Sequence, residues 1–509
     1  MDEARKKERI AALLKKGILL SPDFLDSEDS SVSPSKDVLV FNKDTSELLS
    51  RNEKGINWLE LEKVASLHER GQAGLPSIDD ISPASAPPSL SPDLQVVASH
   101  KVDAEKITVA HFSNYFNTRF RLLERLLRGR PELQGLTAIK RLRSRAVSGN
   151  VSIIGMVSEK RETKNKNLMI TLEDPTGVQR VIINKNRPEL YAEGREIIED
   201  EVIGISGSAK GEIFFANAVV FPDIPSAELK KSPDEEYLAC MSDLHFGSKQ
   251  FMPEEFDRFL SWVNQEAGNQ KQKEIASKLK YILIAGDVVD GAGIYQTQYD
   301  ELTLKDIRDQ YAACAKALSQ IPDNIRLVIS PGNHDAVRMS EPQPPLNNIF
   351  SEPMARLKNA LLVSNPATVR IGVKENFSGF NCLLYHGYSF DHYVANVDSI
   401  RMNGGYERAD LIMKFLLKRR HLAPTHTSTL ISPTPNYDAL FIDTVPDFFI
   451  TGHIHRTNIS NYKATTLINS SCWQSMTSFQ LRLGHNPQPA RLPVVNLKTR
   501  DATIIKFGK

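Results

Sequence analysis

Five short polar blocks constrain this chain more than any other feature, because each stands where an apolar run ends. In chain order they are Asp243-Leu-His245, Gly286-Asp287-Val-Val-Asp290, Gly332-Asn333-His334-Asp335, Tyr-His386-Gly387 and Gly452-His453-Ile-His455. The runs before them are residues 237–241, 281–285, 325–329, 382–385 and 448–450. Their length and apolarity are typical of buried strands. Ligands of open α/β sheets bind outside the carboxyl ends of strands, so we expect the five blocks to form one site.

The side chains in these blocks are carboxylates, one amide and several imidazoles. Such a set suits two divalent transition-metal ions bridged by a shared carboxylate, which in turn indicates phosphoester hydrolysis. A single Asp-x-His or Gly-x-His-x-His is more often a capped turn or a core histidine. Five blocks in chain order favour a metal site over that structural interpretation.

Residues 235 to 505 resemble the calcineurin-like metallophosphoesterase superfamily in these five blocks. The resemblance implies an α/β sandwich with a dinuclear metal site at one edge. It implies that Asp243, His245 and His455 hold the first metal, that Asn333, His386 and His453 hold the second, and that Asp287 bridges both. His334 resembles the general acid, and Asp290 the carboxylate that orients His334 through its other ring nitrogen. Gly291 stands where the related protein phosphatases carry a phosphate-binding arginine, which argues against that class.

The rest of the chain divides by composition and periodicity. We predict an N-terminal helical module (1–70), a disordered linker rich in Pro, Ser and Ala (71–105), a basic helical segment (106–147), an OB-fold barrel (148–225) and the phosphoesterase domain (235–509). The first module is either a docking element or a loosely packed tail. Residues 253–267 and 302–318 are expected crossover helices, and 492–498 and 502–506 are late strands expected to cover the second half of the sandwich.

A long helix is expected over 107–129, with Phe112, Phe116 and Phe120 on its apolar face. Its other face begins the densest basic run of the chain, which is Arg121, Arg125, Arg128, Arg130, Lys140, Arg141, Arg143 and Arg145. This run either contacts the DNA backbone or is a solvated face or subunit contact.

Five strands with a helix between the third and fourth, over 151–218, have the order of an OB barrel. Such barrels often bind single-stranded nucleic acid through aromatic residues. Here aromatic residues are few outside Phe214 and Phe215, so a packing or interface role is an equal alternative.

Charge and cysteines exclude several classes of protein. The formal net charge of +1 excludes a bulk polycation, so nucleic-acid binding would require local patches. The four cysteines are far apart, which argues against a zinc ribbon or a disulfide framework. No apolar window approaches the length of a membrane span, and we expect a soluble cytoplasmic protein with no membrane partner.

The OB barrel in front of the phosphoesterase blocks, together with the strings Met-Ser-Asp-Leu-His-Phe-Gly-Ser and Ala-Gly-Asp-Val-Val-Asp-Gly, resembles the small subunits of archaeal D-family DNA polymerases. That resemblance implies a 3′→5′ proofreading exonuclease with a large catalytic subunit, DNA and a sliding clamp as partners. It also implies manganese, although the residues alone allow manganese, iron or zinc. A stand-alone phosphodiesterase and a non-catalytic polymerase scaffold are the alternatives; the complete ligand set argues against the scaffold.

Overall fold

The computed structural model describes residues 19–20, 40–41, 91–100, 107–143, 149–434 and 437–508. Apart from two short parallel strands, β1 (Leu19–Leu20) and β2 (Val40–Phe41), the predicted N-terminal module lies outside the described residues. The chain divides into a unit of residues 1–85 and a unit of residues 86–509. The architecture below is that of the second unit.

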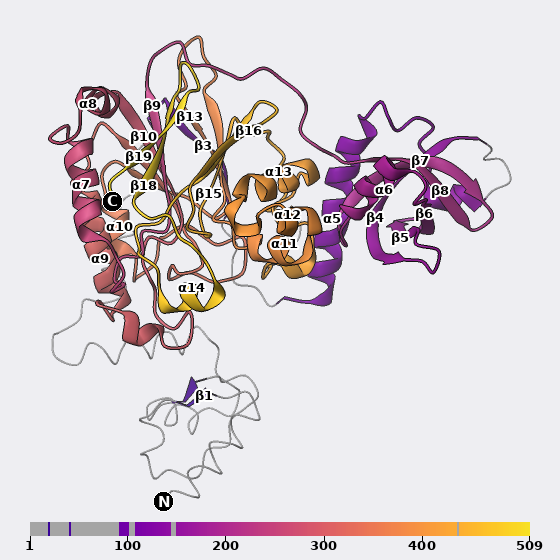
Figure 1. Cartoon of the computed structure of the whole chain (residues 1–509), viewed down its shortest axis with the longest axis horizontal. Helices are drawn as coiled ribbons and strands as arrows, with labels where there is room; N and C mark the ends of the chain where they lie inside the picture. Colours follow the sequence, from indigo (N-terminus) through magenta and orange to yellow (C-terminus); the bar gives the residue numbers. More distant parts are fainter. Residues whose placement is uncertain are drawn as a thin grey trace, which may run out of the picture. The chain divides into compact units, whose positions relative to one another are not determined.

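Two six-stranded sheets form the larger part of this unit (Figure 1). The first has the order β12 (Ala360–Leu362), β11 (Arg326–Ser330), β10 (Leu279–Ala285), β9 (Tyr237–Met241), β18 (Arg491–Asn496) and β19 (Ala502–Lys506). The second has the order β16 (Asn458–Tyr462), β17 (Thr465–Asn469), β15 (Phe448–Thr451), β14 (Phe380–Leu384), β13 (Ala367–Ile371) and β3 (Leu94–Ser99). Strands β9 to β12 are parallel, and β14 is parallel to β15.

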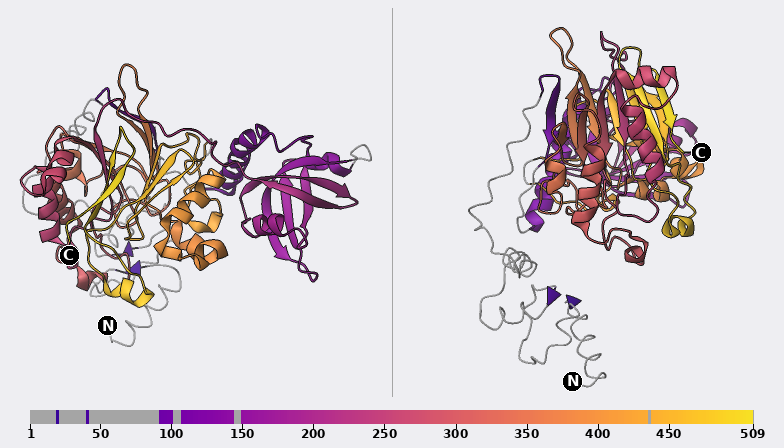
Figure 2. Two further views of the ribbon diagram at one scale, coloured as in Figure 1. Left: turned by 45° about the horizontal axis from the view of Figure 1, so that its top comes forward. Right: turned by 90° about the vertical axis from the view of Figure 1, so that its left-hand side faces the viewer.

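The two sheets share one apolar core. Leu283 of the first sheet and Ile450 of the second belong to the same buried cluster. Helices α7 (Pro253–Val263), α8 (Gln270–Ser277) and α9 (Ile307–Leu318) cover the outer face of the first sheet, and α11 (Phe390–Asn396), α12 (Asp398–Met402) and α13 (Ala409–Arg419) cover that of the second (Figure 2). Strands covered on both faces must be apolar throughout, which explains the continuous runs.

Two features of the fold differ from the sequence-based expectation, namely one domain boundary and the placement of two strands. The predicted linker 71–105 contains β3, which pairs antiparallel with β13 at the edge of the second sheet. The late strands β18 and β19 extend the first sheet beside β9, and therefore do not cover the second half of the sandwich. Both errors concern pairing between segments that are far apart in the chain, which local composition cannot determine.

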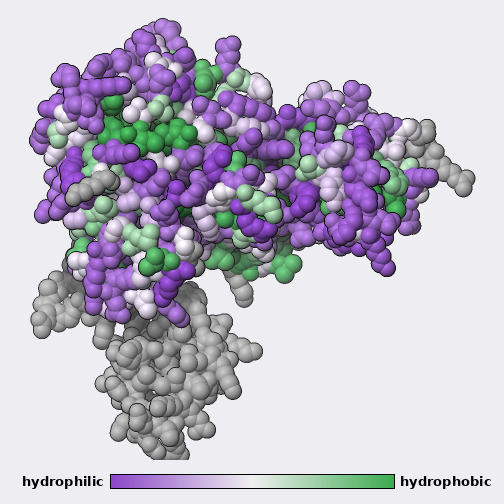
Figure 3. Space-filling view, viewed as in Figure 1, coloured by the Kyte–Doolittle hydropathy of each residue, from purple (hydrophilic) through white to green (hydrophobic). Residues whose placement is uncertain are grey.

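A closed five-stranded barrel precedes the sandwich. Its order is β4 (Val151–Glu162), β5 (Leu168–Asp174), β6 (Gly177–Ile183), β8 (Ile213–Val220) and β7 (Val202–Lys210), and α6 (Pro188–Arg195) lies between β6 and β7. The predicted strand number and helix position are confirmed. Phe214 is fully buried whereas Phe215 is 40% exposed. The visible barrel surface is mainly hydrophilic (Figure 3).

Helix α5 (Val109–Arg128) confirms the predicted long helix and is held by a buried ion pair. Arg119 donates to Asp438 at 3.1 Å and to the carbonyl of Pro424 at 2.7 Å. On the basic face, Arg125 lies 3.2 Å from Asp443, and both side chains are exposed. Whether this face contacts DNA stays a prediction.

The remaining short elements are η2 (Ile139–Arg143), η3 (Gln298–Glu301), α10 (Glu352–Ala355), η4 (Gly405–Glu407), η5 (His426–Ser428) and α14 (Ser478–Leu483). Within the described part of the chain, no helix combines the length and the apolarity that crossing a membrane requires.

Candidate metal centre

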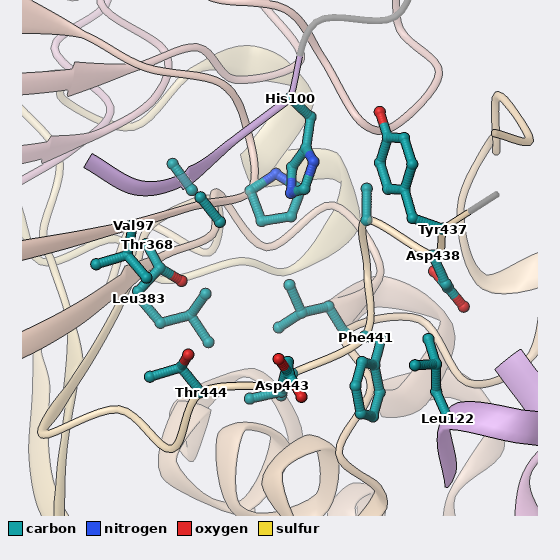
Figure 4. A pocket seen from close by; sticks show the side chains of 16 residues that line it. Val97, His100, Leu122, Thr368, Leu383, Tyr437, Asp438, Phe441, Asp443 and Thr444 are labelled. Carbon is teal, nitrogen blue, oxygen red and sulfur yellow. The ribbon is translucent and has the colours of Figure 1, made fainter. Parts of the chain in front are cut away.

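The polar blocks follow the ends of β9, β10, β11, β14 and β15, and the structure brings them together. Residues of four of the five blocks line a cleft of about 260 Å³. All seven predicted ligand residues and His334 are buried or half-buried, and Asp243 and His386 lie behind the residues that line the cleft. A second cavity, of about 310 Å³, is lined by other residues, among them His100 and Tyr437 (Figure 4). None of the predicted site residues lines that second cavity.

The predicted ligands of the first metal lie within contact distance of one another. The Nε2 atoms of His245 and His455 are 3.1 Å apart, and Nε2 of His455 is 3.3 Å from Oδ1 of Asp243. Their ligand atoms lie within 4.8 Å of one another, and two imidazole nitrogens with a carboxylate oxygen are a common donor set for divalent transition metals. These three residues therefore fit a metal ion.

The predicted ligands of the second metal meet at Asn333. Its Oδ1 lies 2.9 Å from Nε2 of His386 and 3.1 Å from Nδ1 of His453. Oδ2 of Asp287 is 3.2 Å from the same Nε2 of His386. Asp287 can hold a cation both with Asp243 and His386 and with His245 and His334, which places it between the two groups. Mixed nitrogen and oxygen donors fit manganese, iron or zinc.

Each ligand histidine is held by its other ring nitrogen. Nδ1 of His386 lies 2.8 Å from the carbonyl of Ala285, and Nε2 of His453 lies 3.0 Å from Asp391. Such contacts fix the orientation of a ligand ring. Asp391 could not be predicted from the sequence, because a supporting carboxylate outside the five blocks has no spacing signal of its own.

Gln480 holds the remaining histidine of the first group. Its side-chain amide lies 2.7 Å from Nδ1 of His455. This glutamine comes from α14, near the end of the chain, where the capping box formed with Thr477 fixes the first turn. It too carried no signal in the sequence.

Asp290 differs from the expectation. Its Oδ1 lies 3.1 Å from Nδ1 of His245 and accepts a hydrogen bond from Gln474 at 2.9 Å. His334 instead contacts the backbone carbonyl of Asp290, at 2.7 Å from Nδ1. The carboxylate therefore orients a predicted metal ligand, and the main chain orients His334. The sequence spacing was compatible with either partner.

Five of the predicted ligands adopt left-handed backbone conformations. They are Asp243 (φ 52°), His245 (52°), Asp287 (53°), His453 (71°) and His455 (53°). Such conformations cost about 1–3 kcal/mol each for residues with a Cβ, and they cluster at functional sites. The backbone at position 332 packs closely against Asp287, and a Cβ there would lie 2.2 Å from Oδ1 of Asp287. This close contact explains why residue 332 is a glycine.

The buried charges stabilise one another. Burial raises the pKa of Asp287, but His386 and His334 outweigh it and hold that pKa well below its usual range. Asp335 shows the opposite result: burial and the charge of Asp287 raise its pKa to about 7. The lowered pKa favours the ionised form of the Asp287 carboxylate, which is the form that binds a cation.

His334 lies beside the predicted ligands, with its ring centroid 4.7 Å from that of His245. Its backbone N–H donates to Oδ1 of Asp287 at 2.8 Å, and its half-buried ring lines the cleft. Because Nδ1 is occupied by the carbonyl of Asp290, Nε2 is the nitrogen left for a bound molecule.

Comparison with known proteins places this chain in a family. Residues 238–459 match the family of B subunits of DNA polymerases alpha and epsilon. The DNA polymerase II small subunit of Methanothermobacter thermautotrophicus is 33% identical over 96% of this chain and 98% of its own length. This chain belongs to the family of archaeal DNA polymerase II small subunits. The resemblance to the D-family small subunits is thereby confirmed.

Other small subunits of this family are similar to this chain over most of its length. That of Archaeoglobus fulgidus is 38% identical over 76% of this chain and 75% of its own length. That of Pyrococcus abyssi is 39% identical over 79% of this chain, which spans 64% of that relative. Among solved structures, asparaginyl-tRNA synthetase from Pyrococcus horikoshii covers 17% of this chain at 12% identity with a TM-score of 0.16, a likeness too small to support an argument.

Proposed function

We propose that this chain is a metal-dependent 3′→5′ exonuclease of the calcineurin-like metallophosphoesterase type, acting on single-stranded or mispaired DNA ends. The observation that carries the proposal is the convergence of five strand ends on two adjoining ligand groups, with His334 beside them in the same cleft. A non-catalytic scaffold has no need for five strained backbone positions at one place.

Two divalent ions, manganese in the first instance, are the proposed cofactors. Asp243, His245 and His455 would hold one, and Asn333, His386 and His453 the other, with Asp287 between them. When bound, such ions activate water as a nucleophile and neutralise the charge on a phosphate.

His334 has the proposed role of the general acid. Its Nδ1 contact with the carbonyl of Asp290 keeps a proton on that nitrogen in the neutral ring, so a second proton at Nε2 is the one available for transfer. Nε2 would give it to the departing 3′ oxygen. Asp290 and Gln474 would act on the ligand His245 rather than on the acid.

The partners are proposed from the relatives, which are named as small subunits of DNA polymerase II. A large catalytic polymerase subunit would bind this chain and deliver the DNA end, and a sliding clamp is a further proposed partner. We further propose that residues 148–225 form an OB-fold domain and residues 235–509 the catalytic domain.

The decisive experiment compares substrates. The purified chain with manganese is incubated with a 5′-labelled single strand, with matched and mispaired primer ends, and with a cyclic-nucleotide mimic. We expect the single strand and the mispaired end to be shortened faster than the matched end, because no base pair has to melt. Turnover should fall as salt rises and phosphate contacts weaken. Faster hydrolysis of the cyclic mimic would favour the stand-alone phosphodiesterase.

A further inference from the structure

Two stacked aromatic rings line one part of the cleft. Tyr295 lies in the loop after Asp290, and Phe479 lies in α14, close to the other end of the sequence. Their ring centroids are 5.0 Å apart with 23° between the planes. Both line the same cleft as His334. Phe479 is 39% exposed and Tyr295 is half-buried, so apolar ring surface faces the solvent of a catalytic cleft.

Hydrogen bonds to Glu301 stabilise this aromatic platform, which consists of Tyr295 and Phe479. The hydroxyl of Tyr295 donates to Glu301 at 3.0 Å, and the other carboxylate oxygen of Glu301 accepts from Ser478, the residue before Phe479. One carboxylate therefore connects two segments that are more than 150 residues apart in the sequence.

The platform is also tied to the metal ligands. Gln480, the residue after Phe479, contacts His455 at 2.7 Å. On the other side, Gln298 donates to the carbonyl of Asp290 at 2.7 Å and accepts from the N–H of Ile294, the residue before Tyr295. Each ring is thus adjacent in sequence to a residue whose hydrogen bonds lead to the metal-site residues, His455 on one side and Asp290 on the other. Rings that only fill a surface gap do not need such a connection.

The charge of the cleft points to the kind of ligand that these rings take. Among the described residues that line it, none is Lys or Arg. A substrate phosphate at the ligand cluster would therefore make the main charged contact in this cleft. The other contacts with a nucleotide must then be made to its uncharged base. Every base has a flat face that can stack on an aromatic ring, whichever base it is.

We propose that the unpaired base of the 3′-terminal nucleotide stacks on the exposed side of Phe479, with Tyr295 supporting that ring from its other side, and that this contact places the last phosphodiester at the metal ligands. This inference rests on the proposed exonuclease function. A base engaged in a pair and in the duplex stack cannot occupy the platform, so the same contact favours mispaired ends over matched ends.

The test measures KM and kcat of Phe479→Ala on two single strands that differ only at the 3′ end, one with adenine and one with an abasic tetrahydrofuran. We expect KM to rise about tenfold on the adenine end and to stay unchanged on the abasic end, with kcat and metal content preserved. Phe479→Trp keeps a ring and should keep the discrimination. Met476→Ala removes a neighbouring side chain that is 40% exposed and should change neither constant. An equal change on both ends, or on neither, would overturn the inference.

A binding measurement separates this inference from the proposed function. Fluorescence anisotropy gives the Kd of both oligonucleotides for the His334→Ala chain with manganese, with and without Phe479→Ala. We expect about tenfold tighter binding of the adenine end, and only when Phe479 is present. If the wild-type chain cleaves neither strand, the exonuclease proposal fails while this comparison still applies. Equal Kd values for both ends would show that no base stacks there.

Discussion

Asp287 and His334 are adjacent in the site but make different contacts. Both carboxylate oxygens of Asp287 are engaged, one by the backbone of His334 and one by the ring of His386. The ring of His334 is held by a main-chain carbonyl and not by a predicted metal ligand. Removing the carboxylate should therefore remove metal, whereas removing the ring should not.

We predict that Asp287→Ala loses both bound metal and nuclease activity. His334→Ala should keep near-normal metal content while its rate falls by about 10²–10⁴-fold, the usual contribution of a general acid. Metal analysis beside single-turnover rates on an oligonucleotide measures both quantities. Loss of metal in His334→Ala, or an unchanged rate, would show that the acid has been assigned to the wrong residue.

Asp290→Asn tests the revised role of that carboxylate. Because Asp290 contacts His245, the substitution should weaken manganese binding at the first site by about 10–100-fold. His334 should remain in place, since its partner is the main chain. Asp391→Asn is the matched variant, acting on the second site through His453. Manganese titrations should give two separate losses; unchanged affinity in Asp290→Asn would contradict this role.

The convergence of the proposed ligands could be predicted from sequence because each stands where an apolar run ends. Their supporting residues could not. Gln480 and Asp391 reach the site from separate helices, and neither lies in a recognisable block. The predicted contact between the Asp290 carboxylate and His334 was wrong. Sequence spacing places Asp290 near His334, but it does not determine whether the carboxylate or the backbone carbonyl of Asp290 faces the ring.

At the level of elements, continuous apolar runs predicted the inner strands closely. Strand β9 begins and ends where its run does. Strand β3 was missed because its neighbours are rich in Pro and Ser and because its partner, β13, lies about 270 residues away. The positions of β18 and β19 were missed for the same reason. Pairing between distant segments is not written in local composition.

Helix α5 offers a stability test. Arg119 and Asp438 are both fully buried and form an ion pair at 3.1 Å. Arg119→Met breaks this buried ion pair and leaves His421 as the remaining ring partner of the Asp438 carboxylate, so it should lower the free energy of unfolding by about 3–5 kcal/mol. Arg121→Met, on the exposed side of the same helix, should change it by less than about 0.5 kcal/mol. Urea denaturation measures the free energy of unfolding of both variants. Equal losses in the two variants would mean that the ion pair does not anchor the helix.

The same pair predicts the direction of acid sensitivity. Burial raises the pKa of Asp438, but His421 and Arg119 outweigh it and bring that pKa below its usual range. A carboxyl whose pKa is lower in the folded state stabilises the fold above its unfolded pKa, about 3.9, and loses this contribution as pH falls further. Arg119→Met should therefore be less sensitive to acid below about pH 4 than the wild-type chain. An unchanged acid profile would contradict this.

At the scale of the molecule, residues that are far apart in the sequence, from His245 to His485, meet at one cleft. Asp243 lies just after β9, whereas Gln480 lies about 30 residues before the end of the chain. The strands between them form two sheets whose shared core fixes the distance between the two ligand groups. A site built in this way depends on the whole sandwich.

The most direct test of a phosphodiester-cleaving metal site is the time course of a 5′-labelled single-stranded oligonucleotide with the purified chain and manganese. We predict a ladder of products that shorten from the 3′ end, abolished by a chelator and absent in Asp287→Ala. An oligonucleotide that stays at full length with manganese, iron and zinc in turn would contradict the account.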